Sequence, residues 1–167
     1  MGELVENQDS RRTFIDTLCE LAECDPAICL IVPDVGFNYI DLFKEKFPNR
    51  FFNFGVTEAS TIMIAVGMAK EGFRPFVYSM INFVLFRPGE MVRNGIVCHK
   101  VPVVLLGVKG SESYKFLGWS HNLLHDKEDT NFCDNIRLPW YLPQTNEEVR
   151  KTVINVYNSK KAAYIRL

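Results

Sequence analysis

The sequence predicts an α/β fold, a single domain in which one parallel β-sheet carries helices on both faces. Short apolar runs alternate with segments of helical periodicity from about residue 11 to the end of the 167-residue chain. The apolar run 28–32 is continuous, as a strand buried on both faces requires. No linker, internal repeat or low-complexity tract divides the chain, so the alternation is typical of one domain built from βαβ units.

The first half of the chain predicts three helices and two strands. Phe14, Leu18 and Leu21 recur at i, i+4 and i+7, and Asp25 with Pro26 indicates that their helix ends there. The segment 58–70 carries small and aliphatic side chains all round, which predicts a central helix with few solvent-facing positions. The expected elements are helix 13–23, strand 28–32, helix 41–47, strand 51–53 and helix 58–70.

The second half continues the alternation around one long loop. The segment 109–121, about a dozen residues, predicts a loop, and loops of that length inside compact domains tend to be functional. The stretch that follows has no regular pattern. The expected elements are strand 75–78, helix 83–98 with an interruption near Pro88 and Gly89, strand 102–106, strand 137–142, helix 146–157 and strand 162–167.

Composition excludes several classes of protein. The 19 Lys and Arg residues against 20 Asp and Glu residues leave a formal charge of −1 and no basic excess for a nucleic-acid backbone. No apolar run approaches the roughly 18 residues of a membrane span, and the polar N-terminal extension 1–10 is not signal-like. The five cysteines form no Cys-x-x-Cys pair, which indicates neither a zinc ribbon nor a disulfide framework. We therefore expect a cytoplasmic protein without nucleic-acid or membrane partners.

The position of a site follows from the fold class. Ligands of open parallel sheets bind outside the carboxyl ends of the strands, which directs attention to Asp34, 53–58, 79–86 and the loop after Leu106. The motifs G-x-G-x-x-G, G-x-x-x-x-G-K-[ST] and G-x-S-x-G are missing, so the usual dinucleotide, nucleoside triphosphate and serine-nucleophile sites are not predicted. The sequence offers no complete site of a common type, although it can still hold part of one.

Glu58 is a carboxylate at the start of the apolar helix 58–70. In one interpretation Thr57 caps the helix and Glu58 only offsets the helix dipole. In the other, the carboxyl group is shielded from water by its apolar neighbours and stays protonated, ready to donate a hydrogen bond to a ligand. The residues alone leave both interpretations open.

Residue by residue, this stretch resembles the pyrimidine-binding domain of transketolase-like thiamine diphosphate enzymes, beginning with Phe51, Phe52, Gly55 and Glu58. In that family a phenylalanine-rich strand leads through a glycine to a glutamate that opens a buried helix. The resemblance extends over residues 11–167 and implies the thiamine diphosphate-binding fold. Further matches are 72–79, 82–86, Arg93, 101–103, the Gly-Trp-Ser-His of 118–121 in place of the family's Gly-Pro-Thr-His, and 138–147.

The resemblance implies a cofactor site. Thiamine diphosphate reacts at C2 of its thiazolium after its own 4′-imino group removes the proton there, and that tautomer requires an acid bonded to N1′ of the aminopyrimidine. Glu58 matches this acid. Phe83 and Phe86 match aromatic side chains that stack on the pyrimidine, although both would otherwise be assigned to the core. Met80 replaces the family's first aromatic residue. Asp34 matches an acid near the cofactor, and it equally suits a plain turn.

The loop 109–121 carries the candidate substrate residues. His121 matches an active-site histidine that could hydrogen-bond a substrate oxygen or shuttle a proton. With His125 it also has zinc-ligand spacing, but no third ligand is evident and we expect no metal on this chain. Leu117 stands where sugar-using transketolases carry an aspartate, so an ordinary pentose phosphate is not expected unless Glu112 substitutes for it. Cations that either neutralise an anionic substrate or are simply solvated are Arg87, Arg93 and Lys109.

The resemblance also implies a partner. The family binds the diphosphate through Mg²⁺ on a second domain with a Gly-Asp-Gly signature, and these residues contain no Gly-Asp-Gly. We also expect the family's third, carboxyl-terminal domain to be absent from this chain. We therefore expect activity only with a subunit that supplies the diphosphate-binding domain, as a heterotetramer with two copies of each chain. The hydrophobic helix 58–70 is then expected at the interface.

Three functions are compatible with this pattern. The leading one is the pyrimidine-binding subunit of a split transketolase-like enzyme that moves a two-carbon ketol unit from a ketose to an aldehyde. The second is the corresponding subunit of a two-chain 2-oxo acid decarboxylase or dehydrogenase, and the third is a non-catalytic scaffold of the same fold. The Gly-Trp-Ser-His121 element favours the first, and the presence of Glu58 and two platform aromatics argues against the third.

Overall fold

The structure, a computed structural model, describes residues 9–34, 38–110 and 112–167 and is built on one six-stranded sheet. The strand order is β2-β1-β3-β4-β6-β5, and every pair of neighbours is parallel. The predicted fold class is therefore confirmed. The strands are Ile28–Val32 (β1), Phe51–Asn53 (β2), Arg74–Met80 (β3), Val104–Val108 (β4), Trp140–Tyr141 (β5) and Ala163–Arg166 (β6).

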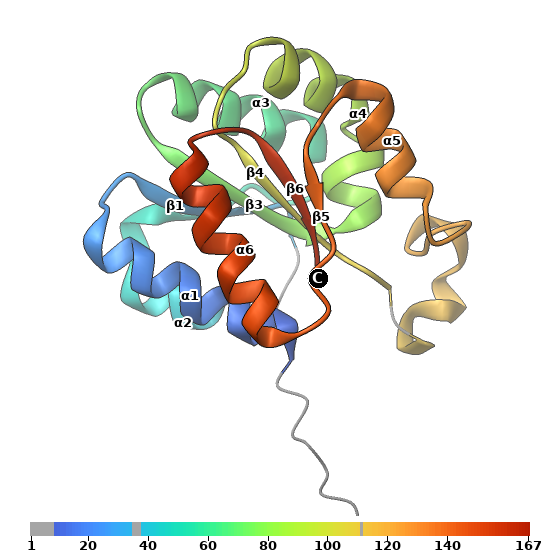
Figure 1. The fold of residues 1–167 in the computed structure, drawn as a ribbon, viewed down its shortest axis with the longest axis horizontal. Coiled ribbons are helices and arrows are strands. Elements are labelled where there is room, and N and C mark those ends of the chain that lie inside the picture. The colour runs from blue at the N-terminus through green and yellow to red at the C-terminus, as the bar shows by residue number, and fades with distance from the viewer. Residues whose placement is uncertain (1–8, 35–37, 111) are drawn as a thin grey trace, which may run out of the picture.

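Helices cover both faces of the sheet (Figure 1). One face packs against α1 (Ser10–Cys24), α2 (Asp41–Lys46) and α6 (Asn146–Ser159), and the other against α3 (Glu58–Lys70), α4 (Gly89–Met91) and α5 (Glu128–Ile136). Successive side chains of β1 alternate between the two cores, since Leu30 lies in the first and Ile31 in the second. Because both faces of the strand are buried, its sequence is a continuous apolar run and does not alternate between apolar and polar residues.

The helix α3 has the predicted bounds, but the expectation that few of its residues face solvent is wrong within this chain. Thr61, Ile62, Ala65, Val66 and Ala69 are buried against the sheet. The opposite side remains exposed, although it is also largely apolar. We call this side the α3 face, and its residues are Ala59, Ser60, Met63, Ile64 and Gly67. A depression of about 440 Å³ lies along it, lined in part by Met91 of α4.

The structure differs from the sequence prediction in two segments, one with another type of helix and one with helical turns in place of a loop. The expected helix 83–98 consists of two π-helical stretches, η2 (Asn82–Phe86) and η3 (Val92–Cys98), on either side of α4. The expected loop 109–121 contains 3₁₀ turns, η4 (Glu112–Ser120), with a kink at Gly118 where φ is 65°. Gly118 is suited to this kink because it has no Cβ to clash in the left-handed region.

The sequence interpretation missed α5 and made the next strand too long. Two of the three buried residues of α5, Asp129 and Thr130, are polar, and only Cys133 is apolar, so the apolar pattern of its core-facing side is short and weak. Arg137 follows in the left-handed conformation and ends the helix, which leaves only Trp140–Tyr141 of the expected strand 137–142. In the described part of the chain, no helix has the length and apolar character needed to cross a membrane.

Candidate functional site

The site lies at the carboxyl edge of the sheet, where the strand order reverses direction. The chain passes from β1 to β2 on one side and then to β3 on the other side of β1. At such a reversal, the connections after the two neighbouring strands run in opposite directions and leave a crevice between them. Open α/β sheets bind ligands in this crevice. Asp34 follows β1, Asn53 ends β2 and Met80 ends β3, so all three lie at this edge.

A turn centred on Asn53 brings the chain to Glu58. The Asn53 Oδ1 atom accepts hydrogen bonds from the backbone N–H of Gly55 at 2.9 Å and of Asp34 at 3.3 Å. Gly55 has a φ of 69°, which a residue without a Cβ adopts readily. Thr57 is the N-cap residue of α3, but its hydroxyl donates to the Phe54 carbonyl at 2.9 Å and makes no capping bond to the helix, contrary to the first interpretation.

Arg87 contacts both Glu58 and Phe83. The Glu58 side chain is only 12% exposed, and its Oε1 atom accepts a 2.6 Å hydrogen bond from Arg87 Nη1. The guanidinium carbon of Arg87 lies 4.0 Å from the centre of the Phe83 ring. Glu58 is therefore sheltered from solvent, as one interpretation of the sequence expected. Its partner is Arg87, which the sequence analysis had considered only as a cation for an anionic substrate or as a solvated residue.

His121 also contacts Phe83. The two rings meet edge to face, with centroids 4.9 Å apart and planes at 77°. The His121 Nδ1 atom is 2.8 Å from the Ser120 hydroxyl. The Asn82 side chain donates to the Trp119 carbonyl at 3.1 Å, which ties the η4 segment to the start of η2. Packing thus brings Glu58, Phe83 and His121 together from three separate segments.

The remaining candidate residues have other neighbours. Phe86 meets the Phe132 ring of α5 edge to face at 5.8 Å, because the wide π-helical turn separates it from the neighbours of Phe83. Met80 is half-buried at the end of β3, and the Asp34 side chain is exposed. The stacking roles of Phe86 and Met80, and a role for Asp34, stay predictions.

The described residues contain no group of three or more His, Cys, Asp or Glu side chains that could hold a metal ion. His125 is exposed, and Leu117 is half-buried. The side chain of Glu112, the alternative to Leu117, lies outside the described part of the structure. The ammonium of Lys109 is paired with Asp126 at 2.6 Å.

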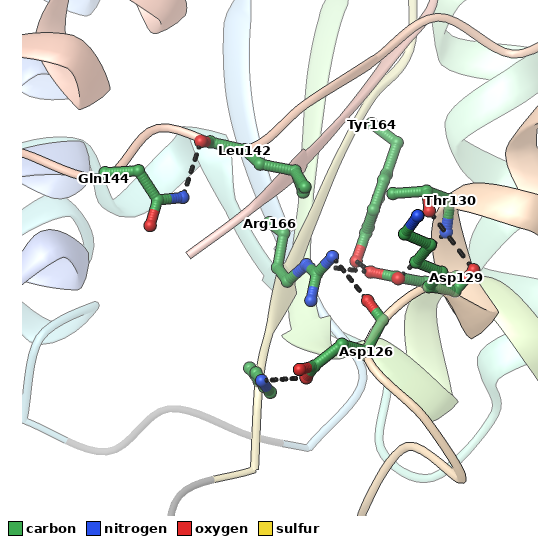
Figure 2. Close-up of polar contacts among 9 residues, drawn as sticks. Asp126, Asp129, Thr130, Leu142, Gln144, Tyr164 and Arg166 are labelled. Atoms are coloured by element: carbon green, nitrogen blue, oxygen red, sulfur yellow. Dashed lines mark hydrogen bonds and ion pairs between the residues drawn. The ribbon is translucent and has the colours of Figure 1, made fainter.

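A second polar cluster joins β6 to α5 (Figure 2). The Tyr164 hydroxyl donates to Asp129 Oδ2 at 2.7 Å, and Arg166 Nε lies 3.2 Å from the same oxygen. Arg166 also donates to the Asp126 carbonyl at 3.0 Å. Burial, and then the Asp129 carboxylate, raise the pKa of Tyr164 well above its usual value. Sequence reasoning missed this cluster because no local pattern marks Asp129 as buried.

Two cavities flank the ion pair between Lys109 and Asp126. One, of about 650 Å³, is lined by residues of η4 and the turn after it, and the other, of about 640 Å³, is lined by Arg166 and its neighbours. Glu58, Phe83 and Arg87 line neither cavity. The contact between Glu58, Arg87 and Phe83 and these cavities are therefore separate parts of the carboxyl edge.

Known proteins resemble this chain in sequence and in fold. It is 29% identical to one of the subunits of the apulose-4-phosphate transketolase of Phocaeicola vulgatus over 158 residues, which are 94% of this chain and 50% of that protein. It is 35% identical to the 1-deoxy-D-xylulose-5-phosphate synthase of Synechococcus sp. (strain JA-3-3Ab) over 121 residues, 69% of this chain and 18% of the synthase.

Two solved structures match the fold. A split-gene transketolase, described as an inactive β4 tetramer, superposes with a TM-score of 0.82 at 26% identity, covering 95% of this chain and 50% of that one. The transketolase from Leishmania mexicana superposes with a TM-score of 0.77 at 17% identity, over 94% of this chain and 24% of that one. The chain thus spans about half, or less, of the length of these relatives.

The family description "Transketolase, pyrimidine binding domain" matches residues 6–167, nearly the whole sequence. The resemblance inferred from Phe51, Gly55, Glu58 and the later segments is thereby confirmed. On this match, the chain belongs to the family of transketolase pyrimidine-binding domains.

Proposed function

We propose that this chain is the pyrimidine-binding subunit of a split, thiamine diphosphate-dependent transketolase-like enzyme. With a partner subunit, it transfers a two-carbon ketol unit from a ketose to an aldehyde acceptor. The relative from Phocaeicola vulgatus is named as one subunit of an apulose-4-phosphate transketolase, which supports both the split organisation and a sugar phosphate substrate.

The observation that carries the proposal is the sheltered carboxylate of Glu58, which one side chain, Arg87, joins to the Phe83 ring at the carboxyl edge of the sheet. A carboxylate that is 12% exposed and a flat aromatic ring, close enough for one planar group to contact both, suit a planar nitrogen heterocycle with a ring nitrogen at its edge. In this structure the Arg87 guanidinium, which is also planar and carries N–H groups at its edge, contacts both the Glu58 carboxylate and the Phe83 ring. The residues present therefore fit the pyrimidine half of thiamine diphosphate.

Each residue then has a role toward the bound group. Thiamine diphosphate, when bound, supplies the reactive carbon of its thiazolium ring. Glu58 holds a proton between its carboxyl group and N1′ of the pyrimidine, and Phe83 covers the ring and excludes water. His121, which lies against Phe83, hydrogen-bonds a substrate oxygen or moves a proton near neutral pH.

The diphosphate and Mg²⁺ are assigned to a partner subunit. This assignment is supported by two relatives, one named as a transketolase subunit and the other as a split-gene transketolase. The α3 face is apolar, exposed and adjacent to Glu58, so we place the partner there. Four chains, two of each kind, are the expected assembly, and the four-chain state named for the split-gene transketolase supports the self-association of such subunits.

The test is reconstitution with the partner subunit in the presence of thiamine diphosphate and Mg²⁺. Two-carbon transfer from ketose phosphates, with apulose 4-phosphate among them, is measured beside decarboxylation of a 2-oxo acid. Glu58→Gln and Glu58→Ala should lower turnover by about a hundredfold or more, because the pyrimidine loses its acid, while assembly stays intact.

Glu71→Gln is the matched control, because Glu71 is an exposed carboxylate at the opposite end of the same helix. It should leave turnover unchanged. Full activity of Glu58→Ala would refute the assignment of this acid. Product formed from a 2-oxo acid alone would favour the decarboxylase or dehydrogenase alternative.

A further inference from the structure

Arg87 occupies the place that the proposed function assigns to the cofactor's pyrimidine. It follows η2 directly, where its backbone N–H donates to the Asn82 carbonyl at 2.9 Å, and Pro88 comes next. Its Nη1 atom donates to Glu58 Oε1 at 2.6 Å, while its guanidinium carbon lies 4.0 Å from the centre of the Phe83 ring. One side chain thus uses both surfaces that would recognise an aminopyrimidine.

The chemistry of the two groups is closely matched. A guanidinium is a planar, delocalised cation that donates N–H bonds from its edge and stacks on aromatic faces. An aminopyrimidine is planar and presents its edge to a carboxyl group in the same way. Glu58 Oε1 and this face of the Phe83 ring can each contact only one planar group at a time. The Arg87 guanidinium and an aminopyrimidine therefore compete for them.

We propose that Arg87 is a built-in competitor that closes the pyrimidine site in the cofactor-free chain and turns out into solvent when the cofactor enters. This inference rests on the proposed function. It explains why a carboxylate that is 12% exposed is tolerated without a ligand, because the arginine neutralises a charge that would otherwise be sheltered and unpaired.

The exposure of the two partners supports a reversible contact. The Arg87 side chain is 44% exposed, so its guanidinium reaches water by rotating about its own side-chain bonds, without a movement of the core. Ion pairs and cation–π contacts at such partly exposed positions are weak. Arg87 therefore covers the site, and a ligand can still displace it. This competition lowers the affinity of the site for the ligand by about fivefold.

The experiment measures binding of thiamine to the full chain. Thiamine carries the pyrimidine but no diphosphate, so it probes this half of the site without the partner's contribution. Titrations followed by ligand-observed NMR compare the wild type with Arg87→Met, which keeps a long side chain but loses the N–H edge and the charge. We expect Arg87→Met to bind thiamine about fivefold more tightly.

A second variant and a matched control make the result specific. Arg87→Lys keeps the charge but not the planar fork, so its affinity should lie between those of the wild type and Arg87→Met. Arg12→Met removes an exposed arginine that is also paired with a carboxylate, Asp16 at 3.0 Å, and should bind as the wild type does. Thermal melts check that each variant is folded.

The outcomes separate this inference from the proposed function. Equal or weaker thiamine binding by Arg87→Met, with binding abolished in Glu58→Gln, overturns the competitor role and leaves the pyrimidine site intact. No binding by either the wild type or Arg87→Met also overturns it, because removal of a competitor should open the site. Thiamine binding that is unchanged in Glu58→Gln refutes the pyrimidine site itself. In the wild type, the Arg87 Nε–H resonance should shift on thiamine addition as it leaves the Phe83 ring.

Discussion

The Tyr164 hydroxyl donates a 2.7 Å hydrogen bond to the Asp129 carboxylate, and neither side chain is exposed to solvent. This bond joins the strand β6 to the helix α5 (Figure 2). Tyr164→Phe should lower the free energy of unfolding by about 1–3 kcal/mol, because it leaves a buried carboxylate without one of its donors. Urea denaturation measures this loss.

Tyr157→Phe is the control for that prediction. It removes a similar 2.9 Å bond to Asp25, but this pair is only partly buried and water can replace the lost donor. A loss as large as that of Tyr164→Phe would contradict the special importance of the buried pair.

Gly107 of β4 has no room for a side chain. A Cβ built there would lie 2.7 Å from both Cε2 and Oη of Tyr164. Gly107→Ala should therefore destabilise the fold by about 1–3 kcal/mol, since Tyr164 must shift away from Asp129. Gly67→Ala, in α3, would have no heavy atom within 4 Å and should instead gain up to about 1 kcal/mol from better helix propensity. Thermal unfolding of both variants compares them, and equal stability would argue against the crowding at Gly107.

The α3 face should decide association. Ile64 is 38% and Met63 44% exposed, so Ile64→Asp or Met63→Asp should leave the isolated chain folded. Either change should weaken binding to the partner subunit by about tenfold or more, because a carboxylate would be buried in an apolar interface. Isothermal titration calorimetry measures the effect. Phe73→Asp, which alters an exposed apolar residue beyond the other end of α3, should bind normally. Equal weakening by Phe73→Asp would move the interface elsewhere.

The N-terminus of α1 should give an acid-sensitive contribution to stability. The hydrogen bond from Arg11 lowers the pKa of Asp9 from 3.8 to about 2. A carboxyl group whose pKa is lower in the folded state stabilises the fold above about pH 4, and this stabilisation disappears as the pH falls toward 2. The contribution should be below about 1 kcal/mol, because the pair is partly solvated.

Asp9→Asn isolates this effect, because asparagine still caps the helix but carries no charge. The difference in unfolding free energy between the wild type and Asp9→Asn should shrink between pH 4 and pH 2. Arg11→Met should reduce the same pH dependence. A difference that is constant across this range would show that the charge does not matter.

The cysteines should fall into two classes of reactivity. Burial raises the pKa of Cys19 to about 11 and the pKa values of Cys29 and Cys133 to about 12, whereas Cys24 and Cys98 are exposed. At pH 8, Ellman's reagent should modify Cys24 and Cys98 in the native chain and the other three only after unfolding. Peptide mapping identifies the modified thiols, and rapid labelling of Cys29 would contradict the buried assignment.

Elements with strong local patterns could be predicted from the sequence. The expected strand 28–32 and helix 58–70 agree with β1 and α3 residue for residue. Both are specified by neighbouring side chains, through a continuous apolar run and a carboxylate at a helix start. The helix α5 could not be found in this way. Its buried residue Asp129 is tolerated only because Tyr164, 35 residues away in the sequence, donates to it.

The amino-acid sequence was enough to predict the alternation of strands and helices, the parallel sheet, the family, and Glu58, Phe83 and His121 as candidate site residues. The packed structure was needed to show that Phe83 contacts both His121 and the arginine of the Arg87–Glu58 pair, and that one apolar side of α3 faces solvent. The periodicity of a sequence identifies the apolar side of a helix or strand, because that pattern is local. It does not identify the residues that pack against this side, because they come from distant parts of the chain. Arg87 and Glu58 are 29 residues apart, and no local pattern links them.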